Sequence, residues 1–139
     1  MRLVPERVQR ALIPILAGVT ATVSFQNGAP GALGLVCLVP FVLLLHAERD
    51  SRRGSFRVGY WFGVGFFAAL LYWIALLADS EIPIRGLTGV GWFVLSLVLG
   101  LVYGLAAFLS SLLRRFLPGP LALALAWVAL DYGRSLGSL

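Results

Sequence analysis

The sequence predicts an all-α protein, a polytopic helical membrane bundle of about five transmembrane helices with a cytoplasmic N-terminus. Of its 139 residues, 60% are hydrophobic and 12% are charged, whereas soluble domains are roughly 45–50% apolar and 25% charged. The uncharged residues gather into long runs, and the mean hydropathy is +0.94. A chain this apolar is expected in a membrane rather than in water.

The first apolar run extends without a charge from residue 11 to residue 45, which is too long for a single span. The turn-forming stretch Gln-Asn-Gly-Ala-Pro-Gly at 26–31 divides it. We therefore expect two helices here, over about 8–25 and 31–47.

Three further apolar runs follow a charged loop at 46–57. Residues 58–78 are uncharged, and at about 1.5 Å per residue they cross the roughly 30 Å hydrocarbon layer. The run at 86–113 is long enough for a tilted span, and a shorter run at 121–130 opens the last helix. The expected helices cover about 58–78, 87–113 and 119–133, so that residues 1–139 form one transmembrane domain.

The arginines predict the orientation of this bundle. If successive helices alternate in direction, the N-terminal tail and the loops at 46–57 and 114–120 share one side. These segments hold nine of the chain's 11 basic residues, all arginine: Arg2, Arg7, Arg10, Arg49, Arg52, Arg53, Arg57, Arg114 and Arg115. The positive-inside rule then places the N-terminus in the cytoplasm. Orientation thus explains the net charge of +5, and we expect no nucleic-acid partner.

Small residues at four-residue spacing predict helix–helix contacts. Gly59 and Gly63 form one such pair, and Gly100 and Gly104 form another. Small residues let helix backbones approach closely where lipid supplies no hydrophobic drive. We expect the third and fourth helices to pack on each other or on neighbours through these glycines.

Aromatic residues crowd the third helix. Residues 60–62 lie where an interfacial aromatic belt is expected. Tyr72 and Trp73 come twelve residues later, about 18 Å along a helix and short of the opposite interface. This pair, like Trp127 in the last helix, is interpreted either as packing against neighbouring helices or as facing lipid.

Few residues offer chemistry of their own. Cys37 has no neighbouring cation or histidine, so its thiol is expected to stay protonated, and His46 has no second histidine to pair with. Asp131 and Arg134 are spaced i, i+3, so they share a helix face and can form an ion pair; the alternative is a solvated helix end. Since no catalytic triad, carboxylate dyad, phosphate loop or zinc spacing is present, we expect no catalytic residue, metal or cofactor.

Two segments resemble the apolipoprotein N-acyltransferase family. The stretch "VGYWFGVGFFAALLYWI" at 58–74 is similar to the family's glycine- and aromatic-rich helix, and "AWVALDYGRSLGSL" resembles its W-x-x-x-E-x-x-R segment. Trp127, Asp131 and Arg134 stand at the matching positions, with aspartate in place of the usual glutamate. The resemblance covers residues 8–139.

The resemblance implies an acyltransferase of the bacterial inner membrane. Such enzymes move an acyl chain from a phospholipid to the α-amino group of a lipoprotein's N-terminal cysteine, through a thioester on a nitrilase-like domain with a Glu-Lys-Cys set. No residue here can be carried over onto that set, and Cys37 belongs to the wrong segment. We therefore expect the N-terminal membrane domain alone, inactive without a nitrilase-like domain, with phospholipid and lipoprotein substrate as partners.

In the family the membrane helices shape a lipid-facing entry, so the resemblance implies that Tyr72 and Trp73 line a surface for acyl chains. A different class of function stays open: a non-enzymatic small membrane protein that packs against a partner through its glycine-rich faces, or a transporter fragment. Because residues 11–45 and the third and fourth helices hold no charge relay, ion coupling is disfavoured while scaffolding is not.

Overall fold

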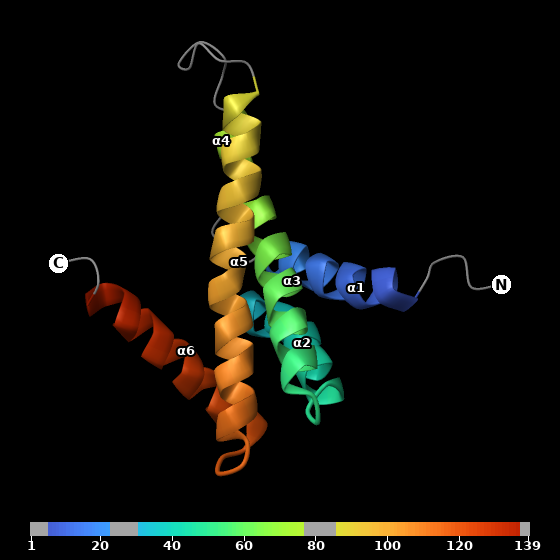
Figure 1. The fold of residues 1–139 in the computed structure, drawn as a ribbon, viewed down its shortest axis with the longest axis vertical. Helices are drawn as coiled ribbons and strands as arrows, with labels where there is room; N and C mark the ends of the chain where they lie inside the picture. Colours follow the sequence, from blue (N-terminus) through green and yellow to red (C-terminus); the bar gives the residue numbers. More distant parts are fainter. Residues whose placement is uncertain (1–5, 23–30, 77–85, 137–139) are drawn as a thin grey trace.

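The computed structural model describes residues 6–22, 31–76 and 86–136, and every regular element in these ranges is an α-helix. The helices are α1 (Glu6–Thr22), α2 (Gly31–Ala47), α3 (Arg52–Leu70), α4 (Tyr72–Leu76), α5 (Leu87–Leu113) and α6 (Gly119–Leu136). In Figure 1, α5 runs along the long axis with α3 beside it, while α1 and α6 lean away to opposite sides. The all-α class predicted from the sequence is confirmed for the described residues.

Of the described helices, α5 alone is both long and apolar enough to cross a bilayer. It has 27 residues with a mean hydropathy of 2.3 over its most apolar window. Shorter apolar helical stretches occur at Arg10–Thr22, Leu38–Ala47 and Gly119–Gly133. A membrane helix needs about 20 apolar residues, so the five spans expected from the sequence stay a prediction.

The third helix begins at Arg52 rather than near residue 58, so residues 52–57 of the expected loop belong to it. Ser51 supplies the reason. Its backbone is extended, with φ −121° and ψ 107°, and its side-chain oxygen accepts a hydrogen bond from the Gly54 backbone N–H. This N-cap satisfies one of the N–H groups that a helix start leaves without a partner.

The same helix breaks at Leu71 instead of continuing to residue 78. The Leu71 backbone N–H donates to the Phe67 carbonyl at 2.9 Å. The next carbonyl, that of Ala68, accepts the indole N–H of Trp92 on α5 at 3.0 Å. Since the last four carbonyls of a helix have no partner within it, the Trp92 side chain satisfies one of them and ties the break to α5.

Glycines set the distance between α3 and α5. A Cβ added to Gly59 would lie 2.5 Å from the Tyr103 carbonyl oxygen, and one added to Gly63 would lie 2.7 Å from the Tyr103 Cβ. From the other side, a Cβ on Gly100 would lie 2.6 Å from the Val64 Cγ2, and one on Gly104 would lie 2.9 Å from the Phe56 ring. At Gly59 and Gly63 the obstacle is the Tyr103 backbone or its Cβ, so the two helix backbones run in close contact there.

The opposite side of α3 receives α1 and α2. A Cβ on Gly18 of α1 would collide with the Phe62 carbonyl, and the Thr22 hydroxyl donates to the Phe66 carbonyl at 3.2 Å. From α2, Phe41 stacks on Phe62 with ring centroids 4.1 Å apart. Both rings are buried. The central position of α3 therefore comes from contacts on several of its faces.

Candidate functional site: a groove between α3, α5 and α6

A groove of about 220 Å³ lies where α3, α5 and α6 meet. Each helix contributes three lining residues: Phe66, Phe67 and Leu70; Val102, Tyr103 and Ala106; Trp127, Leu130 and Asp131. Eight of these side chains are aromatic or aliphatic, and one is a carboxylate. The groove is therefore an apolar site with a single charged position.

Helical periodicity explains how each helix supplies its share of the lining. On α3 and α5 the three residues are spaced i, i+1 and i+4, and on α6 they are spaced i, i+3 and i+4. Residues at these spacings lie on one face of a helix with 3.6 residues per turn. The groove thus forms where each of the three helices directs one apolar face toward the other two helices.

Tyr103 holds the aromatic lining together. Its ring meets Trp127 edge-on, with centroids 4.3 Å apart and planes at 83°, and meets Phe67 at 5.4 Å and 87°. Phe66 lies 5.7 Å away with its ring tilted by 31°. Edge-to-face pairs at these separations match the favourable interaction of a ring's positive edge with a negative face. These contacts fix the shape of the groove.

Sequence reasoning missed Tyr103, although a signal for it was present. The residue lies three positions after Gly100 and one before Gly104. Its i, i+3 spacing from Gly100 puts it beside that glycine on the helix surface predicted to contact a neighbour. An aromatic residue on a close-packed face is well placed to contact the aromatics of the facing helix, and here it contacts Phe62, Phe66 and Phe67.

The structure separates the aromatic residues that the sequence grouped together. Trp127 lines the groove and packs against the core. Tyr72 and Trp73 lie on α4, with 51% and 53% of their surfaces exposed, and neither lines the groove. Their lipid-facing role stays a prediction, while the groove assigned above depends on Trp127 and on three α3 residues just before this pair.

The charged residue of the groove comes from α6. Asp131 is exposed and lines the groove beside Leu130. Arg134 follows within the same helix, but its side chain lies outside the described part of the structure, so the predicted ion pair stays a prediction. The Cys37 side chain is likewise outside it. Among the residues described, no three His, Cys, Asp or Glu side chains form a candidate metal site.

Comparisons with known proteins bear on all three walls of the groove. A family model described as the apolipoprotein N-acyltransferase N-terminal domain matches residues 17–139, which include α3, α5 and α6. The chain is also 30% identical over 128 residues to an apolipoprotein N-acyltransferase of Geobacter metallireducens. This match covers 89% of the chain but 24% of the relative, so the chain spans about a quarter of that protein's length. No solved structure matches this chain significantly.

The matched range contains both segments whose residues carried the resemblance, at 58–74 and 126–139. The groove brings residues of these two segments together, since Phe66, Phe67 and Leu70 face Trp127, Leu130 and Asp131 across it. The resemblance inferred from the sequence is confirmed by the family match. This chain belongs to the apolipoprotein N-acyltransferase family, and it carries that family's N-terminal domain.

Proposed function

We propose that this chain is the membrane domain of a phospholipid-dependent apolipoprotein N-acyltransferase and that its groove receives an acyl chain of the donor lipid. One observation carries the proposal: the groove between α3, α5 and α6 is lined by Phe66, Phe67, Tyr103 and Trp127 with aliphatic residues between them. An acyl chain makes dispersion contacts and forms no hydrogen bonds, and the apolar lining of the groove matches that chemistry.

The single carboxylate gives the groove a direction. Asp131 lies at the α6 wall, and the other lining residues are apolar or aromatic. The ester that ends an acyl chain only accepts hydrogen bonds, as an ionised carboxylate does, so the hydrocarbon part belongs against the rings and the ester away from Asp131. The groove would thereby present the bond that is broken in acyl transfer at one defined end.

We further propose that the domain spans the bacterial inner membrane several times with its basic end in the cytoplasm. The arginine distribution supports this orientation. A contact between helix ends supports the gathering of these arginines at one end, since Arg114 at the end of α5 donates to the Leu45 carbonyl near the end of α2 at 2.8 Å. The α2–α3 turn, the start of α3 and the α5–α6 turn, which together hold six of these nine arginines, therefore lie at one end of the molecule (Figure 1).

In this proposal the 139 residues bind lipid and the chemistry belongs to a nitrilase-like domain. The sequence contains no lysine, so a Glu-Lys-Cys set is not among these residues. Covalent acyl transfer needs a nucleophile that is activated by a base or by a lowered pKa. The polypeptide of these residues alone is expected to be inactive, with phospholipid, a nitrilase-like domain and a lipoprotein as its partners.

Photocrosslinking tests the groove. The purified chain is reconstituted in vesicles with a phospholipid that carries a diazirine near its acyl terminus, and adducts are mapped by mass spectrometry. We expect labelled peptides that contain Phe66–Leu70 or Trp127, and Val102→Phe, which fills the groove from α5, should reduce that labelling. Val98→Phe is the matched control, because Val98 is exposed one turn earlier on α5. Labelling that is uniform over lipid-exposed helices, or insensitive to Val102→Phe, would overturn the proposal.

The alternative of a small helix-packing membrane protein draws on the glycine-rich faces. Gly59, Gly63, Gly100 and Gly104 already face residues of α3 or α5 within this chain. In the proposal above they serve the contact between α3 and α5 rather than a contact with another protein. The two functions are also separated by reading the gene beyond codon 139: an open frame for an α/β domain with Glu, Lys and Cys favours the acyltransferase, and an unrelated gene favours the alternative.

A further inference from the structure

We propose that the arginines at one end of the bundle bind the phosphate of an anionic phospholipid headgroup. The basic end is defined here by the arginines of the α2–α3 turn, the first two turns of α3 and the α5–α6 turn: Arg49, Arg52, Arg53, Arg57, Arg114 and Arg115. It is separate from the acyl-chain groove, because Arg114 follows the last α5 lining residue, Ala106, by eight positions, about 12 Å of helix.

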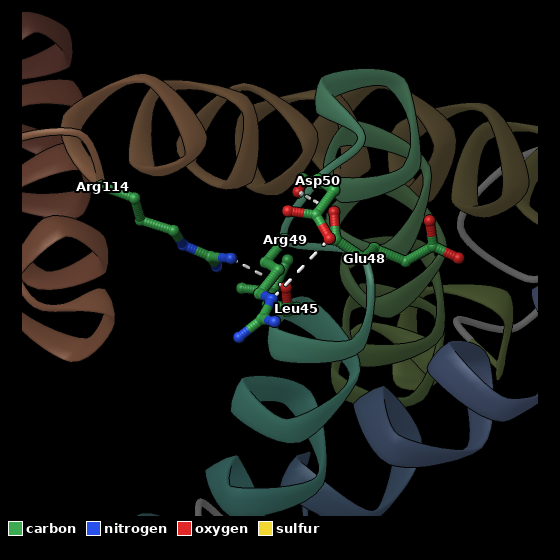
Figure 2. A network of polar contacts seen from close by, with 6 residues as sticks. Leu45, Glu48, Arg49, Asp50 and Arg114 are labelled. Atoms are coloured by element: carbon green, nitrogen blue, oxygen red, sulfur yellow. Dashed lines mark hydrogen bonds and ion pairs between the residues drawn. The ribbon is translucent and has the colours of Figure 1, made fainter.

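One hydrogen bond brings the two basic turns together. The Arg114 Nη1 donates to the Leu45 carbonyl at 2.8 Å, as Figure 2 shows. Leu45 lies in the last turn of α2, where carbonyls lack partners within the helix and a cation is favoured by the helix dipole. Arg114 therefore joins the end of α5 to the end of α2, and the arginines of both turns form one surface.

The carboxylates in these two turns do not neutralise that surface. Asp50 lies 3.7 Å from the Arg49 Nε, in a pair whose side chains are 61% and 95% exposed. The Glu48 carboxylate contacts the position that a Gly54 side chain would occupy, in the first turn of α3, where the helix dipole favours an anion. Arg52, Arg53 and Arg115 are exposed, and none forms an ion pair with a described carboxylate.

One N–H donor of Arg114, at Nε, has no hydrogen-bond acceptor among the described residues. This nitrogen is buried. A Cβ added to Gly119 at the start of α6 would lie 4.0 Å from this atom. Partial burial lowers the pKa of Arg114 from its ordinary value, but an arginine stays charged at neutral pH. The exposed guanidinium groups of Arg52, Arg53 and Arg115 are the ones that a phosphate can reach, and the fork of donors on each matches two phosphate oxygens.

The neighbouring side chains favour a lipid phosphate over a phosphate in water. Phe116 follows Arg115 directly and is 83% exposed, just beyond the apolar helix α5. A phenyl ring at that level fits the interfacial aromatic belt of a membrane. Basic segments next to an apolar span attract anionic lipids by about 1 kcal/mol for each Lys or Arg, so several arginines act together here.

Native mass spectrometry of the full chain in detergent tests this inference. Delipidated protein is titrated with phosphatidylglycerol and, separately, with phosphatidylcholine of the same acyl chains. We expect preferential retention of phosphatidylglycerol. Arg115→Gln should lower its affinity roughly fivefold, and the triple change Arg52→Gln, Arg53→Gln and Arg115→Gln by about a hundredfold at low salt. These side chains are exposed, so the variants should fold.

The matched control is Arg10→Gln, which removes one positive charge from an exposed position on α1. Arg10 is expected on the same membrane side but lies outside the basic end, so this change should lower the phosphatidylglycerol affinity less than Arg115→Gln does. Equal retention of both lipids, or an equal loss with Arg10→Gln, would show that no site exists at the basic end. Displacement of the lipid by millimolar inorganic phosphate would assign the arginines to free phosphate instead. Val102→Phe should leave this preference intact, which separates a failure here from a failure of the acyl-chain groove.

Discussion

The indole of Trp127 meets the ring of Tyr103 edge-on, with centroids 4.3 Å apart. This contact attaches α6 to α5, and Tyr103 in turn contacts Phe67 of α3 at 5.4 Å. Two segments far apart in the sequence, which together carry the family resemblance, thereby become opposite walls of one groove. The relationship explains why neither segment would form the site alone.

The Tyr103–Trp127 pair should show a measurable coupling energy. We expect the double-mutant cycle of Tyr103→Leu and Trp127→Leu to give about 1 kcal/mol, the usual range for an aromatic pair. Unfolding in detergent by a denaturing surfactant, followed by circular dichroism, supplies the free energies. The control cycle uses Tyr72→Leu and Trp73→Leu, two exposed residues. A coupling no larger than in that cycle would contradict the contact.

Gly63 should not tolerate a methyl group. A Cβ there would lie 2.7 Å from the Tyr103 Cβ and 3.0 Å from the Gly100 Cα, so Gly63→Ala must push α3 and α5 apart, at a cost of about 1–3 kcal/mol. Gly91→Ala on α5 is the matched control, because nothing lies within 4 Å of its Cβ position. That control should be neutral or stabilising, by up to about 1 kcal/mol. Equal effects of the two changes in the same unfolding assay would refute the close approach.

Trp92→Phe should loosen the break between α3 and α4. It removes the indole donor from the Ala68 carbonyl, and a hydrogen bond of this kind contributes about 0.5–1 kcal/mol. Amide hydrogen exchange at residues 71–76 should become faster while exchange in α6 stays unchanged. Trp73→Phe serves as the control, since the Trp73 side chain is half exposed. Unchanged exchange at the break would show that the indole bond does not hold it.

Arg114→Met should separate the ends of α5 and α2 while keeping most of the apolar stem. The loss of the bond to the Leu45 carbonyl is expected to cost about 1 kcal/mol. Spin labels at Ala47 and Phe116 would report a broader distance distribution. Arg115→Met, at an exposed neighbour, should not change it. A distribution unaltered by Arg114→Met would contradict the bridge.

The bridge should be insensitive to pH between about 6 and 9. Burial lowers the pKa of the Arg114 guanidinium, so the folded state binds fewer protons than the unfolded state between the two pKa values. Stability therefore rises with pH only in that interval, which lies far above neutrality because arginine titrates there. A stability change near neutral pH that disappears in Arg114→Met would contradict this assignment.

Cys37 should not carry an acyl group. After incubation of the purified chain with phospholipid, we expect no thioester by intact-mass measurement, and no mass loss on treatment with hydroxylamine. The reason lies in the sequence, where no histidine or basic residue neighbours Cys37 to generate a thiolate. Cys37→Ser provides the reference mass pattern. An adduct lost in that variant would assign chemistry to this residue.

Local patterns were sufficient to predict the helical class, the turn between α2 and α3, and the segments that carry the family resemblance. Apolar runs and charge-bearing breaks depend on neighbouring residues alone, which is why they can be read from a sequence. The start of α3 at Arg52 was also signalled locally, by Ser51 as a capping residue. The end of α3 before Leu71 was not signalled locally, since the run of apolar residues continues past Leu71.

The sequence by itself determined which segments are apolar helices, which residues carry positive charge and to which family the chain belongs. Only the tertiary structure decided that Trp127 rather than Tyr72 and Trp73 lines the groove, that Tyr103 joins its walls and that Arg114 unites the two basic turns. The physical reason is that helical periodicity determines which residues share a face of one helix. Which residues of another helix lie against that face depends on how closely the glycines let the two helices approach.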